Sequence, residues 1–405
     1  HWEELKSTNS GGYTAGSSHN SGVSTGGGGQ CIDAPSLVNV FQKSLFLSGD
    51  TAFGAAIAHS APTNDLDPDG LYDFTSSGGG GQIAAGFDVV QIKPFRDDLF
   101  VFGNNGIKKI SLNATNIFVT DQVTANVGCV ARDSVLEIGG DLMFLSPDGF
   151  RPVAGTSRIG DVELETVSKP IQATLVDLIK NNDMDTLNGV VIRSKSQIRY
   201  FFQQDEGSNL KVAGDSEGII GGLTDSQGAI GWEFGTLLGI RASCCTSGYV
   251  GNTEFILHGD YDGSVYKQES GTSFDGSDII SIYSTPYLDF GETEQRKVIR
   301  KVNTFVRAEG PLEMLLSMTY DWGDGGVSTP STYAQSSTGA PTDYAGRNIN
   351  YNATNVLYGG SSKPIMITDV QGSGFSAQAT FVTVGQSEPF SIQGLVFEFS
   401  VAGRR

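Results

Sequence analysis

The chain has 405 residues, of which 54 are glycine and only 18% are charged, and its formal net charge is −19. This length suits about two or three domains. The deficit of Lys and Arg excludes nucleic-acid binding through clustered basic residues. The negative charge has two interpretations, general solubility or a surface that stays close to DNA without adhering to it. Glycine-rich sequence with many Phe and Tyr residues is typical of an all-β protein with many tight turns.

The first residues differ from the rest of the chain. Residues 7–30 are nearly all Ser, Gly, Thr and Asn, which predicts a flexible arm over residues 1–30. The first strand-like run follows at residues 38–47. No stretch approaches the ~18 apolar residues of a membrane span, so we expect no membrane insertion.

Three stretches share one pattern, an apolar strand, an Asn-Gly or Asp-Gly pair and a second strand. They cover residues 99–110, 142–153 and 256–266. Asn-Gly and Asp-Gly supply the positive φ angles of a type I′ turn, so each stretch predicts a β-hairpin. Recurring hairpins indicate repeated small sheets, as in a β-propeller. The turn spacing predicts about four to six blade-like sheets.

One segment departs from the β pattern. Ile171, Leu175, Leu178 and Ile179 share one face of a helix, which predicts an amphipathic helix over about residues 168–182. Ser168 is its expected N-cap, and a proline suits the first turn. The predicted fold class is therefore all-β, an irregular β-propeller over residues 31–275 with this one inserted helix.

The sequence after residue 276 has a different pattern of strand-like runs. Strand-like runs at 302–306 and 312–318 predict a strand pair, and further strands are expected at 364–367, 377–384 and 390–400. We expect a β-sandwich-like domain over residues 276–405.

One acidic segment has the spacing of a metal loop. Asp65, Asp67 and Asp69 alternate before Gly70, and Asp73 follows. Alternating carboxylates before a glycine can hold Ca²⁺, although the twelfth loop position is Ser and not the Glu of an EF-hand. A solvated acidic loop is the alternative, so Ca²⁺ is the only cofactor the sequence suggests.

A basic cluster stands out in this acidic chain. Arg296, Lys297, Arg300 and Lys301 fall within six residues. Positive charges on a strand edge can block aggregation. They can also form an interface with an acidic neighbour, including the next copy of the same chain.

Cysteines and catalytic residue types give little sign of chemistry. The adjacent Cys244 and Cys245 would point to opposite faces of a strand, and with Cys31 and Cys129 we expect them to be buried free thiols, as in a reducing cytoplasm. We find no Ser/His/Asp arrangement, phosphate loop or dinucleotide motif, so we expect no catalytic residues and no enzyme activity.

Several motifs resemble those of one protein family. They are the strand Arg96 to Gly103, the pair Gly128-Cys129, the strand Ile138 to Ser146, the turn Asp148 to Phe150, the helix start Pro170-Ile171, the run Thr285 to Gly291 with the basic cluster after it, and the terminal Gly403-Arg404-Arg405. Their order resembles the tail hub and nozzle proteins of short-tailed bacteriophages, including the packaged-DNA stabilisation proteins. The resemblance covers roughly residues 38–320 and the end of the chain.

The resemblance implies a structural protein of the virion tail that is assembled in the cytoplasm of the host bacterium. Such a chain forms a six-fold homo-oligomeric ring below the portal and the adaptor (head–tail connector) protein and carries fibres, a spike or tip proteins. The genomic DNA passes through the ring without sequence-specific binding, and the ring retains the packaged genome. A ring requires a heterologous interface, for which the basic cluster and the Asp65 to Asp73 loop are candidates.

Two other functions remain open from the sequence. A glycan-binding, lectin-like β-propeller at a surface or in secretion would need clustered aromatic residues, whereas Trp2, Trp232 and Trp322 are scattered. A calcium-stabilised propeller hydrolase would need the acidic loop to bind metal.

Overall fold

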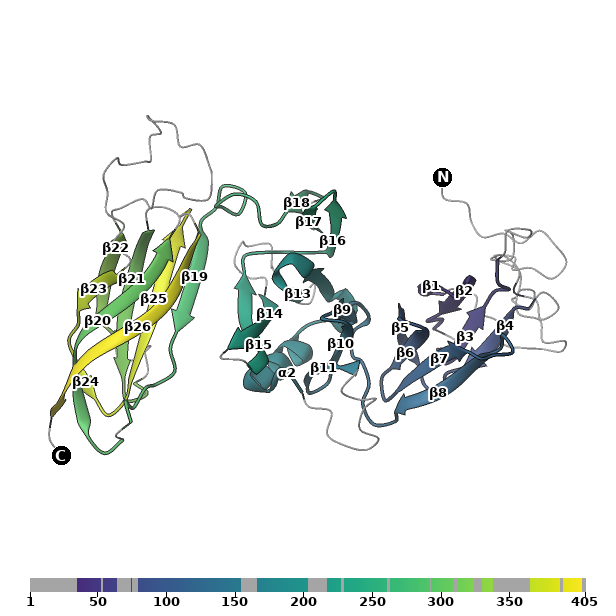
Figure 1. Ribbon diagram of the computed structural model, residues 1–405, viewed down its shortest axis with the longest axis horizontal. Coiled ribbons are helices and arrows are strands. Elements are labelled where there is room, and N and C mark those ends of the chain that lie inside the picture. The colour runs from purple at the N-terminus through teal and green to yellow at the C-terminus, as the bar shows by residue number, and fades with distance from the viewer. Residues whose placement is uncertain are drawn as a thin grey trace. The chain divides into compact units, whose positions relative to one another are not determined.

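The computed structural model describes residues 35–402 except 52–53, 64–73, 75–78, 154–165, 203–216, 227–228, 261–262, 292, 309–311, 324–329, 338–364 and 387–388. The chain divides into two compact units, His1–Glu269 and Ser270–Arg405. Each unit is built from antiparallel sheets (Figure 1).

The first unit contains five small sheets in its described residues, each formed by strands consecutive in the chain. Sheet one holds β1 (Leu37–Phe41), β2 (Ser44–Ser48), β3 (Ala56–His59) and β4 (Gly81–Ala84); sheet two holds β5 (Val89–Phe95), β6 (Asp98–Gly103), β7 (Ile107–Leu112) and β8 (Phe118–Thr124); sheet three holds β9 (Leu136–Ile138), β10 (Asp141–Ser146) and β11 (Gly149–Pro152). Sheet four holds β12 (Asn188–Ile192), β13 (Gln197–Phe202), β14 (Glu217–Ser226) and β15 (Ala229–Leu238), and sheet five holds β16 (Cys244–Val250), β17 (Thr253–Gly259) and β18 (Val265–Lys267).

These sheets pack against each other through their first strands. Strand β1 contacts β5, β9 contacts β12, and β12 contacts β16, while β5 contacts the 3₁₀ turn that precedes β9. Consecutive meander sheets joined at their first strands are the arrangement of β-propeller blades. The predicted fold class, an all-β irregular propeller with an inserted helix, is confirmed for the residues that the structure describes.

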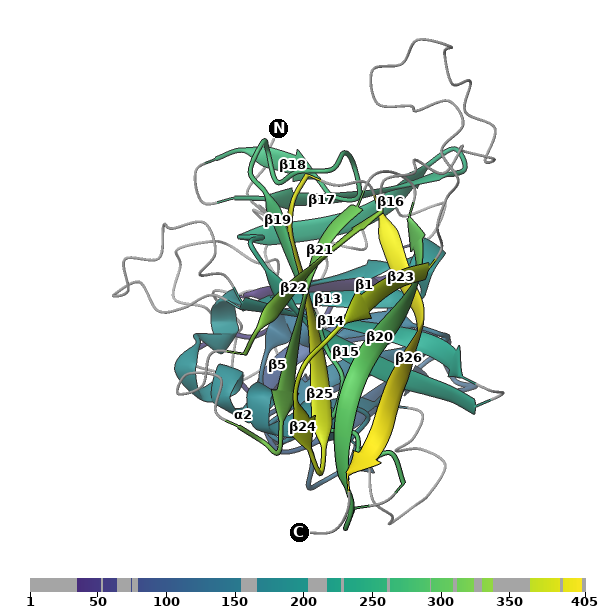
Figure 2. The same cartoon turned by 90° about the vertical axis from the view of Figure 1, so that its left-hand side faces the viewer.

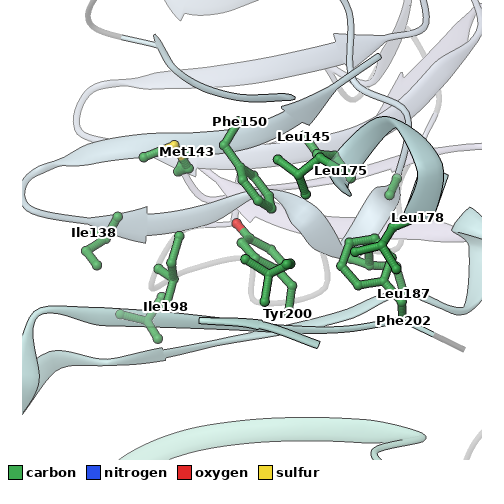
Figure 3. Packing of buried hydrophobic residues seen from close by; sticks show 13 residues of the cluster. Ile138, Met143, Leu145, Phe150, Leu175, Leu178, Leu187, Ile198, Tyr200 and Phe202 are labelled. Carbon is green, nitrogen blue, oxygen red and sulfur yellow. The ribbon is translucent and has the colours of Figure 1, made fainter. Parts of the chain in front are cut away.

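The helix lies where the hydrophobic pattern placed it. A 3₁₀ turn, Lys169–Ile171, leads into α2 (Gln172–Asn181), whose Leu175 and Leu178 are buried. They join a core between sheets three and four in which the ring of Phe150 stacks on that of Tyr200 (Figure 3). Ser168 occupies the predicted N-cap position, before the 3₁₀ turn, but its hydroxyl accepts a hydrogen bond from Phe150 N (2.9 Å) and makes no side-chain capping bond.

The three predicted hairpins form; the first two do so without type I′ turns, and the central residues of the third turn, 261 and 262, lie outside the described residues. Strands β6 and β7, β10 and β11, and β17 and β18 pair as expected. Of the turn residues described there, only Gly149 and Gly263 have positive φ, 136° and 82°. Consecutive positive φ angles, as in a type I′ turn, occur at Gly139 and Gly140 (62° and 79°), which join β9 to β10, and also at Gln42 and Lys43 (48° and 66°). Residues 38–47 are therefore a hairpin, not one strand.

The second unit is a two-layer β-sandwich (Figure 2). One sheet has the order β19 (Ile279–Ser284), β25 (Ala377–Gly385), β21 (Leu312–Tyr320) and β22 (Thr332–Ser337). In the other, β20 (Arg296–Ala308) lies between β26 (Phe390–Ala402) on one side and β23 (Ile365–Asp369) with β24 (Ser373–Gly374) on the other. The predicted pairing of 302–306 with 312–318 is wrong, since β20 and β21 belong to different sheets that enclose one apolar core.

Candidate functional site

The predicted calcium loop lies outside the described residues, which begin again at Phe74 after residue 63. Asp65, Asp67, Asp69 and Asp73 therefore remain a sequence-based prediction. Among the residues that the structure describes, no group of three or more His, Cys, Asp and Glu side chains could hold a metal ion.

The basic cluster lies on β20, the central strand of its sheet, and is not one continuous patch. Lys297 is only 2% exposed, and its Nζ donates to the backbone oxygen of Phe375 (3.2 Å). Arg296 donates to Ser373, and Arg300 donates through Nε to the hydroxyl of Ser400 (3.3 Å). The four charges therefore divide between the core face and the outer face of the sheet.

Lys301 reaches the outer face because of a β-bulge. The register of β20 and β26 shifts between Ile299 and Lys301, which places Arg300 opposite no residue of β26. Lys301 Nζ then lies 3.8 Å from an oxygen of Asp369, whose side chain is 85% exposed. The outer face carries Arg296, Arg300 and Lys301.

The two long sides of the sandwich differ. On the β22/β23 side, the side chain of Gln335 donates to the hydroxyl of Thr368 (2.7 Å). The backbone N–H of Gln371 donates to the hydroxyl of Tyr333 (2.9 Å). The opposite side holds a cavity of about 530 Å³ lined by Tyr283 of β19 and by Phe390, Ile392, Gln393, Gly394 and Leu395 of β26. Polar contacts thus connect the two sheets on one side, and an apolar cavity separates their edges on the other.

An exposed aromatic pair lies elsewhere on the sandwich. Trp322 is 71% exposed, and one face of its indole stacks on Tyr287 with 5.0 Å between ring centroids. Asp321 and Trp322 both have positive φ, 51° and 53°, in a turn closed by a hydrogen bond from Gly323 N to Tyr320 O (3.0 Å). Glycine is favoured at such positions, so the tryptophan is held in a backbone conformation that costs about 1 kcal/mol.

The described histidines have packing roles. His59 lies against Phe46 and Phe118, and burial lowers its pKa despite a hydrogen bond to Ser60. His258 stacks on Tyr266 and contacts Gln268, and burial also lowers its pKa. Both rings are therefore mainly neutral near pH 7.

Only part of the cysteine prediction is confirmed. Cys129 is a buried free thiol, and burial raises its pKa to about 11. Cys244 and Cys245 are free on β16, but Cys244 is exposed and Cys245 half-buried, because both faces of this last small sheet are partly uncovered. Cys31 lies outside the described residues.

No family model matches the chain, and no curated protein matches it. Solved structures with weak similarity include the N-terminal domain of Nup159 (13% identity, 59% of this chain, 62% of that chain, TM-score 0.34) and Hsv2 of Kluyveromyces lactis (12% identity, 52% and 62%, TM-score 0.27). A third is a glycoside hydrolase family 43 arabinoxylan arabinofuranohydrolase from Bacillus subtilis (9% identity, 90% and 94%, TM-score 0.24). The chain spans less than two thirds of the length of the first two. Similarity at this level carries no functional conclusion.

No helix in the described part of the chain is long and apolar enough to cross a membrane.

Proposed function

We propose that this chain is a structural subunit of a short-tailed bacteriophage tail, a nozzle or hub protein that assembles with copies of itself into a ring around the DNA channel. The observation that carries the proposal is the β19/β26 side of the second unit, where a cavity lined mainly by apolar residues adjoins the 13-residue strand β26, which has no strand partner on its outer side among the described residues. A long apolar edge beside an uncovered core is typical of a subunit that is completed by a neighbour.

Charge and chemistry are compatible with this role. The first unit carries most of the negative charge, with 17 Lys and Arg against 32 Asp and Glu in residues 1–269. A negative channel wall would let DNA pass with little adhesion. The proposal assigns the chain no catalytic step. Its partners would be the adaptor above the ring and the fibre or tip proteins attached to it.

The mass of the purified chain tests the proposal. We expect sedimentation velocity to show a species several times the chain mass of 42.8 kDa, with six copies in a closed ring. Electron micrographs of that species should show a central channel. A monomer at every accessible concentration, alone and with the adaptor, would contradict the proposal. Repeating the run with a chelator tests whether the acidic loop contributes.

Glycan binding is a second candidate function, favoured by the exposed Trp322–Tyr287 pair. The free face of an indole stacks on the apolar face of a pyranose ring, and aromatic side chains provide contact area at low entropic cost.

We therefore expect Trp322→Ala to abolish any glycan-array binding shown by the wild-type chain. Tyr249→Ala, which removes a 52% exposed aromatic from the first unit, is the matched control and should leave binding unchanged. Absence of binding by the wild-type chain, or equal loss in both variants, would rule out this role for Trp322.

A further inference from the structure

Strand β26 has an unprotected edge. It pairs with β20 along one side and forms no strand pair on its other side within the described residues. Natural edge strands are commonly protected by lysine, proline or short length. The 13 residues of β26 contain neither Lys nor Pro and one charge, Glu398. The one bulge on this strand leaves Gln393 without a partner at the rim of the cavity, so residues 394–402 form a regular free edge.

The opposite edge of the same sheet is formed by the five-residue strand β23, which also contains neither Lys nor Pro. Strand β23 pairs with β20 through Ile365 to Asp369 and has no strand partner on its far side in the described part of the chain. Its Ile367 is 65% exposed, and Val396 of β26 is 46% exposed. Ile367 and Val396 are the two residues opposite Asn303 of β20, one on each neighbouring strand. Residues opposite each other in a sheet point to the same face, so both side chains lie on the outer face. Each edge strand of the sheet therefore presents an exposed apolar side chain on the outer face.

We propose that the β26 edge of one copy of this chain pairs with the β23 edge of a second copy, so that the sheet continues from subunit to subunit. Such an interface is heterologous, because two different edges meet, and repetition of a heterologous contact gives a ring or a filament. The proposal rests on the proposed function only in requiring that copies of this chain assemble. In this arrangement the incoming sandwich also covers the cavity beside β26.

Charge favours a second copy of this chain as the occupant of the edge. Strands β23 and β26 both run antiparallel to β20, so they run in the same direction. Asp369 and Glu398 both lie opposite Lys301, so the proposed contact displaces β23 by two residues toward the end of β26 and brings Asp369 level with Ser400. There Arg300 of the other copy is exposed, with its guanidinium bonded to Ser400. In that alignment a carboxylate and a guanidinium from two copies come together, and Glu398, the one charge of β26, lies two residues away from the pair.

Two single substitutions test the edges. A lysine on an edge strand blocks pairing, so Val396→Lys should block the β26 edge and Ile367→Lys the β23 edge. Each variant alone is expected to sediment as a monomer. An equimolar mixture should form dimers and nothing larger, since each variant keeps the one edge that the other lacks. Val250→Lys, at a 71% exposed position in the first unit, is the control and should assemble like the wild type.

A charge exchange tests the register. Arg300→Glu and Asp369→Arg should each weaken assembly, and the double variant should restore it, because the pair is re-formed in reversed order. Circular dichroism of every variant checks that the sandwich is folded.

The outcomes separate this inference from the proposed function. If the oligomer of the wild-type chain persists in both edge variants, the edge contact is overturned. The proposed ring is then not contradicted. Dimers from either edge variant alone would mean that one edge pairs with itself, which also overturns it. A wild-type chain that is monomeric in every condition overturns both. Loss of assembly in each edge variant, together with dimer formation in their mixture, supports the contact.

Discussion

Replacing Phe150 with alanine is expected to destabilise the first unit by about 3–5 kcal/mol. Phe150 is fully buried on β11, where its ring stacks on Tyr200 at 4.5 Å and on Phe234 at 6.0 Å between centroids. It belongs to the core that joins sheets three and four with helix α2 (Figure 3). Removing the ring leaves a cavity that rigid neighbouring strands cannot fill, so both the transfer free energy and the contacts are lost.

The measurement is urea-induced unfolding of the wild type and the variant, followed by far-ultraviolet circular dichroism. Tyr200→Phe is a control in the same core. It keeps the stacked ring and removes only the hydroxyl that donates to the backbone oxygen of Ser134 (2.8 Å), which should cost about 1 kcal/mol. Tyr249→Ala, at an exposed position, should change stability by less than about 0.5 kcal/mol. If Phe150→Ala costs no more than the two controls, the two sheets do not share one core.

Local sequence signals predicted the elements of this fold. The Asn-Gly and Asp-Gly pairs located three hairpins, because glycine and asparagine or aspartate permit compact turns of several types. They did not determine the turn type. Positive φ at Gln42 and Lys43 arises from the pairing of Phe41 with Ser44, which no turn propensity indicates. The strand pairing imposes this turn on two residues with no preference for it.

The basic cluster shows why site prediction was weaker. Strict alternation along a strand would place Lys301 on the same face as the buried Lys297. The bulge at Arg300 reverses the alternation after that residue, so Lys301 is exposed beside Asp369. A bulge depends on the register with β26, almost one hundred residues later, and no local pattern encodes it. For the same reason, the apolar run at 390–400 predicted a strand but not that the strand is an edge.

The second large effect is expected where sheets four and five meet in the first unit. Arg199 of β13 is only 6% exposed, and its guanidinium contacts Glu269, which follows β18, and Gln268 (2.7 Å). Lys195 also contacts Glu269. Removing the carboxylate leaves Arg199 charged in a site with little water. We expect Glu269→Gln to cost about 2–3 kcal/mol, at the lower end for a buried pair because Glu269 is 32% exposed.

This pair also makes stability depend on pH. Burial raises the pKa of Glu269, but hydrogen bonds and charge from Lys195 and Arg199 outweigh it, so the pKa lies below the ordinary value of 4.5. A carboxyl group whose pKa is lower in the folded state stabilises that state fully above its unfolded pKa. The stabilisation is lost as the pH falls through the folded pKa. The stability difference between wild type and Glu269→Gln should therefore be constant above about pH 5 and shrink below it.

Urea unfolding from pH 7 down to pH 3 measures this difference directly. Lys195→Met is the matched control, because the Lys195 side chain is 49% exposed and its contact with the same carboxylate is largely screened by water. It should cost less than about 1 kcal/mol. A difference between wild type and Glu269→Gln that does not change with pH would mean that the carboxylate is not ionised against Arg199. Equal losses in Glu269→Gln and Lys195→Met would show that burial of the guanidinium does not set the strength of the contact.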